Sequence, residues 1–88
     1  MQPDSADAEL KWGLTLALQR RPEAALPHLR RAIELEPENL CMREAMGRVL
    51  LEAGRRTEAM EQFEALLRLD PNQTGAREAL GHVFKIER

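Results

Sequence analysis

The sequence predicts an all-α protein of about five helices, paired into antiparallel hairpins that stack as a short right-handed solenoid. The first reason is composition: strong helix formers, namely Leu (14), Ala (12), Glu (12) and Arg (11), make up more than half of the 88 residues. The second and third are helix-breaking residues that recur every 34 positions: Pro3, Pro37 and Pro71, and Gly13, Gly47 and Gly81. Two kinds of breaker residue with one period indicate a repeat array.

Each repeat is expected to be a helical hairpin. The sequence places first helices over about 6–19, 40–53 and 74–87 and second helices over about 22–35 and 57–69. Each second helix should end before Pro37 or Pro71, because the residue preceding a proline is pushed out of the helical region. The chain is then a single domain with repeat 1 over about 6–39, repeat 2 over about 40–73, and a half repeat or capping helix over about 74–88.

Local signals support these boundaries, with two exceptions. Pro22 suits the first position of a helix, and three polar residues suit N-cap positions, namely Asn39, Thr57 and Thr74. Pro27 falls inside a second helix and predicts a mild bend or a frayed start. The alternating apolar residues of 10–18 suggest a strand, but the aligned stretch 43–52 lacks this alternation and a lone strand has no partner. We therefore expect a helix there.

The same residue types recur at matching positions of the repeats. They are Gly13, Leu16, Ala25, Leu29 and Pro37 in repeat 1, Gly47, Leu50, Ala59, Phe63 and Pro71 in repeat 2, and Gly81 and Phe84 in the last helix. In this spacing they resemble the tetratricopeptide repeat family, whose signature is W-x2-L-G-x2-Y, then A-x3-F, then a proline. The resemblance covers about residues 3–88. Small residues would let the two helices of a hairpin approach closely, namely Gly13, Gly47, Ala25 and Ala59, and large residues would fill the space beside them, namely Leu16, Leu50, Leu29 and Phe63.

The sequence also departs from the family signature. Its opening Trp is replaced by Glu9, Arg43 and Arg77, and Leu66 stands where a small residue is usual. These departures concern the fine packing rather than the fold.

The resemblance implies a protein–protein interaction module, a scaffold or adaptor without catalysis, whose first helices line a concave groove. By register, the groove positions are Leu10, Leu14 and Ala17 in repeat 1, Cys41, Glu44, Arg48 and Leu51 in repeat 2, and Glu78, His82 and Lys85 in the last helix. We expect the partner to be a peptide or an amphipathic helix whose apolar residues meet Leu10 and Leu14. The alternative is that these leucines only cover the end of the stack.

One subclass of the family is excluded. Members that clamp acidic chaperone tails use Lys, Asn and Arg at defined groove positions. Here those positions hold residues that cannot bind a carboxylate, namely Leu10, Leu14, Ala45, Gly75 and Ala79.

Composition argues against several other classes of function and indicates the compartment and source of the protein. A net charge of -2 argues against a nucleic-acid binder. Because no apolar run approaches the roughly 18 residues of a membrane helix and Met1 begins no visible leader, we expect no membrane partner. The lone Cys41 excludes an internal disulfide and indicates a reducing, cytoplasmic compartment. The Arg-rich, Lys-poor usage points to a bacterial source with a GC-rich genome.

Chemistry-bearing residues are few, and we expect neither an enzyme nor a cofactor or metal. The single serine, Ser5, lies near the end of the chain. Cys41 and His82 belong to different repeats without an orienting carboxylate, and His28 and His82 lack metal-ligand spacing. No glycine-rich phosphate loop is present.

A basic ridge is a further possibility. Arginine pairs recur on the turns of successive repeats, namely Arg20, Arg21, Arg55 and Arg56. They form either a small anion-binding ridge or ordinary surface neutralised by the nearby Glu23, Glu52 and Glu58.

The ends of the array leave three explanations open. The last helix carries apolar residues with no hairpin partner after it, namely Leu80, Val83, Phe84 and Ile86, and the opening helix is similarly apolar. The last helix is a cap, or the chain is part of a longer protein, or two chains form a homodimer. The corresponding alternatives for function are a self-associating module and a regulatory or substrate-docking domain of a larger enzyme.

Overall fold

A computed structural model of the chain describes the backbone of residues 5–87 and the side chains of residues 5–81. Over that range the regular secondary structure is entirely helical, which confirms the predicted fold class. The helices are α1 (Ala6–Leu18), α2 (Pro22–Leu35), α3 (Leu40–Glu52), α4 (Arg56–Leu69) and α5 (Thr74–Glu87). The alternating stretch at residues 10–18 lies within α1, so it is helix rather than strand.

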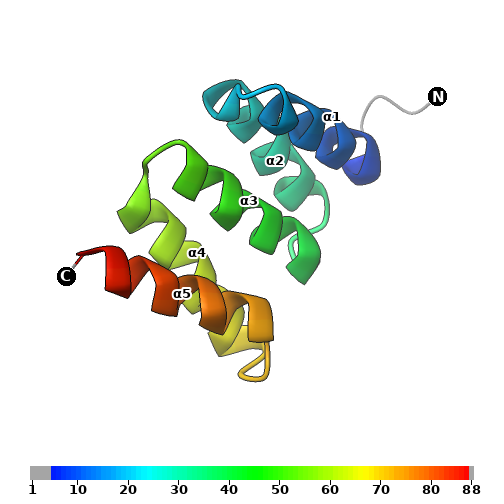
Figure 1. Cartoon of the computed structure of the whole chain (residues 1–88). Coiled ribbons are helices and arrows are strands. Elements are labelled where there is room, and N and C mark those ends of the chain that lie inside the picture. Colours follow the sequence, from blue (N-terminus) through cyan, green and yellow to red (C-terminus); the bar gives the residue numbers. More distant parts are fainter. Residues whose placement is uncertain (1–4, 88) are drawn as a thin grey trace.

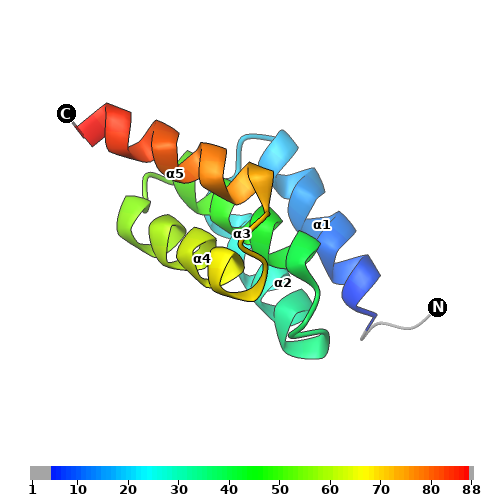
Figure 2. The same ribbon diagram turned by 90° about the horizontal axis from the view of Figure 1, so that it is seen from below.

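The helices form two layers. Neighbours in sequence pack on each other throughout, α1 on α2, α2 on α3, α3 on α4 and α4 on α5. Figures 1 and 2 show α1, α3 and α5 in one layer and α2 and α4 in the other. α3 also contacts α1 and α5, whereas α2 and α4 do not contact each other in the described part of the chain. The layer of first helices is therefore the more closely spaced one, on the inner side of the curved stack.

Small residues allow the two helices of each hairpin to approach closely. Ala25 and Ala59 are fully buried. A Cβ atom placed on Gly13 would lie 3.0 Å from the Leu29 side chain, and one placed on Gly47 would lie 2.7 Å from the Phe63 ring. The expected role of these small residues is thus visible in both hairpins.

The third glycine of the series differs. A Cβ atom on Gly81 would meet nothing within 4 Å, and Gly81 is exposed. In the described structure Gly81 therefore makes no close helix crossing of the kind seen at Gly13 and Gly47. The physical reason is that α5 is approached by α4 and α3 but by no later helix in the described chain.

The core lies between the two layers. Its largest fully buried side chains are Phe63, Leu26, Leu29, Leu50 and Leu66. Leu66 is completely buried although the family prefers a small residue there, so the stack accommodates it within the core. Leu16 is half-buried, whereas Pro37 and Pro71 are exposed in the turns between hairpins. The side chain of Phe84 lies outside those that the structure describes.

Helix starts follow the predicted caps in part. Asn39 caps α3 as expected, and its side-chain oxygen accepts a hydrogen bond from the Met42 backbone N–H at 3.3 Å. Thr57 is not an N-cap: α4 begins at Arg56, so Thr57 lies inside the first turn. The chain enters the helix directly from the tight turn, and the Ala59 N–H already donates to the Arg55 carbonyl. Thr74 is likewise the first residue of α5 rather than its cap.

Two backbone features complete the hairpins. α2 begins at Pro22 and continues through Pro27 without a break, so the frayed start predicted for Pro27 is not seen. The turn after each first helix contains a residue with positive φ, Arg20 at 63° and Gly54 at 79°. These residues lie 34 positions apart, so both hairpins use the same turn conformation. Only glycine adopts it without steric cost.

Candidate functional site

A solvent-open hollow of about 450 Å³ lies between α1 and α3. One wall comes from the second half of α1, and the other comes from one face of α3. Its lining residues are Leu14, Ala17, Leu18, Cys41, Glu44, Ala45, Arg48, Val49 and Glu52. A volume of this order lies within the range of ligand pockets in proteins, and the hollow opens on the layer of first helices.

The predicted groove residues fall into four groups. Half of them line this hollow, namely Leu14, Ala17, Cys41, Glu44 and Arg48. Leu10 and Leu51 are half-buried and pack against the core, while Glu78 is exposed on α5. The side chains of His82 and Lys85 lie outside the described residues.

The hollow also includes residues that the sequence analysis did not assign to it. These are Leu18, Ala45, Val49 and Glu52. Leu18 and Glu52 are the last residues of α1 and α3 and hold the same position in the 34-residue repeat. Continuing the helical count by one residue beyond Ala17 and Leu51 would have found both.

The apolar side of the hollow is unusually exposed. Leu14 is 38% exposed and Leu18 is 86% exposed, and Trp12 on the same helix is 61% exposed. Leu14 and Leu18 lie about one helical turn apart and form the apolar wall of the hollow, whereas the Trp12 ring lies against His28 of α2. Exposed apolar patches such as this wall are typical of interaction sites. α1 is therefore the helix with most apolar surface available to a partner among those described.

The charged side of the hollow is partly neutralised internally. The Arg48 guanidinium donates two hydrogen bonds to Oε2 of Glu44, at 2.9 Å from Nη2 and 3.2 Å from Nε. Gly75 of α5 lies against this pair, because a Cβ atom there would lie 2.5 Å from the same carboxylate oxygen. The pair thus links the charged wall of α3 to α5.

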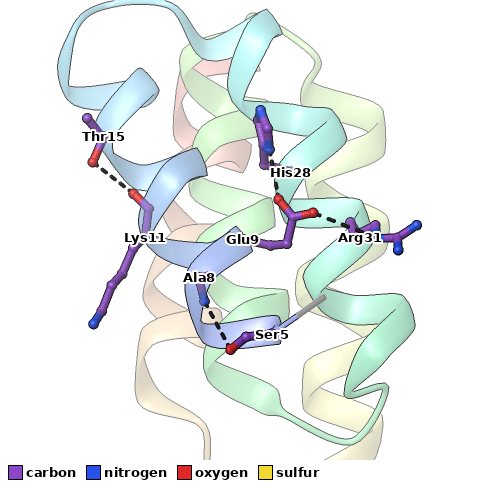
Figure 3. Close-up of polar contacts among 7 residues, drawn as sticks. All are labelled: Ser5, Ala8, Glu9, Lys11, Thr15, His28 and Arg31. Carbon is purple, nitrogen blue, oxygen red and sulfur yellow. Dashed lines mark hydrogen bonds and ion pairs between the residues drawn. The ribbon is translucent and has the colours of Figure 1, made fainter. Parts of the chain in front are cut away.

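A second polar cluster joins α1 to α2 (Figure 3). Oε1 of Glu9 lies 2.9 Å from Nδ1 of His28, and Oε2 lies 3.7 Å from Nε of Arg31. The His28 ring also lies against the Trp12 ring, with centroids 5.8 Å apart. Glu9 stands where the family signature has Trp, so this substitution was the sequence signal for a polar helix–helix contact.

The basic ridge is neutralised at its centre. Nη2 of Arg55 lies 2.7 Å from Oε1 of Glu23, and Nη1 of Arg55 lies 3.3 Å from Oε1 of Glu58. Its hydrogen bond and charge interaction with Glu23, followed by those with Glu58, raise the pKa of Arg55. The interpretation of ordinary neutralised surface is confirmed for Arg55 through Glu23 and Glu58. The Arg55–Glu23 pair also connects the turn of one hairpin to α2 of the other.

The described residues also limit the chemistry available. No three His, Cys, Asp or Glu side chains among them are arranged to hold a metal ion. Cys41 is an exposed free thiol. None of the described helices is long and apolar enough to cross a membrane.

The antiparallel hairpins, their 34-residue period and the small residues at their crossings define a helical-repeat protein. The profile of the tetratricopeptide repeat family matches residues 16–82. The chain therefore belongs to the tetratricopeptide repeat family, whose repeats generally mediate protein–protein interaction.

Several larger proteins contain a similar segment. DnaJ homolog subfamily C member 3 of Rattus norvegicus is 31% identical over 85 residues, which cover 97% of this chain and 17% of the rat protein. The probable UDP-N-acetylglucosamine--peptide N-acetylglucosaminyltransferase SPINDLY of Solanum lycopersicum is 34% identical over 72 residues, covering 82% of this chain and 8% of that protein. The protein of the same name from Petunia hybrida is 32% identical over 86 residues, covering 96% and 9%. The chain thus spans less than a fifth of each relative.

Proposed function

We propose that this chain is a protein–protein interaction module that binds a peptide or a helix of its partner in the groove formed by α1, α3 and α5, without catalysis. The observation that carries this proposal is the open hollow between α1 and α3, whose apolar wall exposes Leu14 and Leu18. A hollow with an apolar wall suits the apolar face of an amphipathic segment. Membership of the tetratricopeptide repeat family supports the same function.

The site has little that would support chemistry. Cys41, the one nucleophilic side chain in the hollow, has no hydrogen-bond partner among the described residues, and Glu44 beside it is engaged with Arg48. An activated thiol needs a neighbouring base or cation to hold its proton or its charge. These residues therefore favour binding over catalysis. The lone thiol is consistent with a cytoplasmic location for the protein.

Self-association is the second candidate, favoured by the exposed apolar side chains of α1. Leu14 is 38% exposed and Leu18 is 86% exposed on one face of α1, so a second copy packed on that face would remove both from water. Light scattering behind a sizing column, over a range of concentrations, separates the two candidates. A stable mass of twice 10.0 kDa would favour the homodimer, and a mass of 10.0 kDa would leave the groove free for another protein.

A third candidate is a docking or regulatory part of a larger enzyme. It is supported by the two SPINDLY relatives, which are named as probable transferases and contain the similar segment within 8% and 9% of their length. Binding through the groove is common to this candidate and to the first.

The groove is tested with peptides selected from a random library displayed on phage, using the intact chain as bait. The double variant Leu14→Ala with Leu18→Ala should lose most of the affinity for the selected peptides. Because both side chains are exposed, it should fold like the parent. Leu69→Ala removes an equally apolar side chain, 60% exposed on α4, and is the matched control. Equal binding by the double variant would refute the proposal.

A further inference from the structure

The hollow between α1 and α3 has an unbalanced charge. Arg48 and Glu44 satisfy each other across 2.9 Å. Glu52 is exposed at the rim and has no hydrogen-bond or ion-pair partner among the described residues. The two walls of the hollow therefore carry one carboxylate that is not matched by a cation.

This carboxylate stands beside the most exposed apolar side chain of the hollow. Leu18 and Glu52 hold the same repeat position at the ends of α1 and α3. They line the hollow together and also line the adjoining one, which Arg20 and Pro22 complete. Arg20 forms no ion pair with Glu52 in the described structure. An apolar surface and an unpaired acid thus adjoin each other at one end of the groove.

We infer that the groove selects a basic amphipathic segment, in which a large apolar side chain lies on Leu14 and Leu18 and a lysine or arginine reaches Glu52. This inference rests on the proposed groove-binding function and specifies the charge of the partner. On a helix, residues three or four positions apart share one face, so the apolar residue and the cation are expected at that spacing. An acidic segment would meet Glu52 directly and would have to displace Glu44 from Arg48.

The experiment uses three synthetic peptides of about 15 residues, a length at which isolated helices are marginal but can form on a surface. All three carry leucine at helical spacing, and their remaining positions are filled mainly with lysine, glutamate or glutamine. Each is titrated into the isotopically labelled full chain and followed by amide chemical shifts. We expect the lysine peptide to shift the amides of Leu14, Leu18 and Glu52. It should bind about fivefold more tightly than the glutamate peptide. This factor corresponds to the largest contribution usual for one exposed ion pair.

Two variants locate the charge effect. Glu52→Gln should weaken the lysine peptide about threefold and leave the glutamine peptide unchanged, since an exposed ion pair contributes only a small factor. Glu64→Gln removes a carboxylate that is also exposed, on α4, and should change neither affinity. Raising the salt concentration should lower the affinity of the lysine peptide for the parent more than its affinity for Glu52→Gln.

The possible failures are distinguishable. If the glutamate or glutamine peptide shifts the same amides with equal affinity, the inferred basic preference is overturned while groove binding stands. If Glu52→Gln binds the lysine peptide as tightly as the parent, the assignment of Glu52 is wrong. If no peptide shifts any amide of α1 or α3, the proposed groove-binding function fails as well.

Discussion

The glycines at one repeat position should respond oppositely to the same substitution. A Cβ atom on Gly47 would lie 2.7 Å from Cζ and 2.9 Å from Cε1 of Phe63, well inside the roughly 3.5–4.0 Å of favourable carbon contacts. A Cβ atom on Gly81 would meet nothing within 4 Å in the described structure. We therefore expect Gly47→Ala to destabilise the fold and Gly81→Ala to stabilise it.

The magnitudes follow from two opposing contributions. Alanine is favoured over glycine inside a helix by about 1 kcal/mol. Gly81→Ala should keep this gain and raise the melting temperature by about 4–8 °C. At Gly47 the Phe63 ring is fully buried and has to move, and overpacking of a core costs about 1–3 kcal/mol. Because two ring atoms lie within 3.0 Å of the added Cβ, we take the upper end of this cost. After the gain in helix propensity is subtracted, Gly47→Ala should lower the free energy of unfolding by about 2 kcal/mol.

Gly13 provides the intermediate case. A Cβ atom there would lie 3.0 Å from Cδ2 and Cγ of the fully buried Leu29. The smaller overlap should nearly cancel the gain in helix propensity, so Gly13→Ala should change the free energy of unfolding by less than about 1 kcal/mol. Urea unfolding followed by far-ultraviolet circular dichroism measures all three variants. Equal stabilisation by Gly47→Ala and Gly81→Ala would refute the reasoning, because it would mean that the Phe63 ring yields without cost.

Three further predictions concern the turns, the ion pair between hairpins and the core. Arg20→Gly should stabilise the chain and Gly54→Ala should destabilise it, by up to about 1 kcal/mol each, because both positions have positive φ; an unchanged Gly54→Ala variant in urea unfolding would contradict this. Glu23→Gln should lower the melting temperature more at low than at high salt, since it breaks the pair with Arg55. Because the pKa of Arg55 is raised, its guanidinium stays charged and the stabilisation by this pair should stay constant from about pH 6 to 9, with the arginine charge lost at extreme alkaline pH; a loss of stabilisation between about pH 6 and 9 would contradict the assignment. Phe63→Ala should lower the free energy of unfolding by about 3–5 kcal/mol, which urea unfolding would show as a much lower midpoint; an unchanged midpoint would contradict the place of Phe63 in the core.

The fold was predictable because its signals act locally and recur. Pro37 ends a helix through the backbone of the residue before it, and Gly47 permits a close crossing whatever the surrounding sequence. Each predicted helix lies within one residue of the observed one, the usual variation at helix ends. The N-cap at Thr57 was wrong because the turn at Gly54, rather than a side-chain cap, determines where α4 begins.

The candidate site was predictable only in part, because a hollow depends on how two helices diverge. Counting along the helix places Leu14 and Arg48 on the inner layer, and both line the hollow. The same count places Leu10 there, but Leu10 packs against the buried core instead. Leu18 and Glu52, the last residues of α1 and α3, complete the lining of the hollow.

The first position of the family signature shows why repeats share a fold without sharing a surface. In repeat 1, Glu9 joins α1 to α2 of the same hairpin through His28 (Figure 3). In repeat 2, Nε of Arg43 donates to the Pro37 carbonyl at 3.0 Å and so joins α3 to the turn that precedes it. The same repeat position thus contacts the other helix of its own hairpin in repeat 1 and the turn between the two hairpins in repeat 2. Since Leu18 and Glu52 also differ at one repeat position, we expect the residues that depart from the repeat to determine which partner the proposed groove accepts.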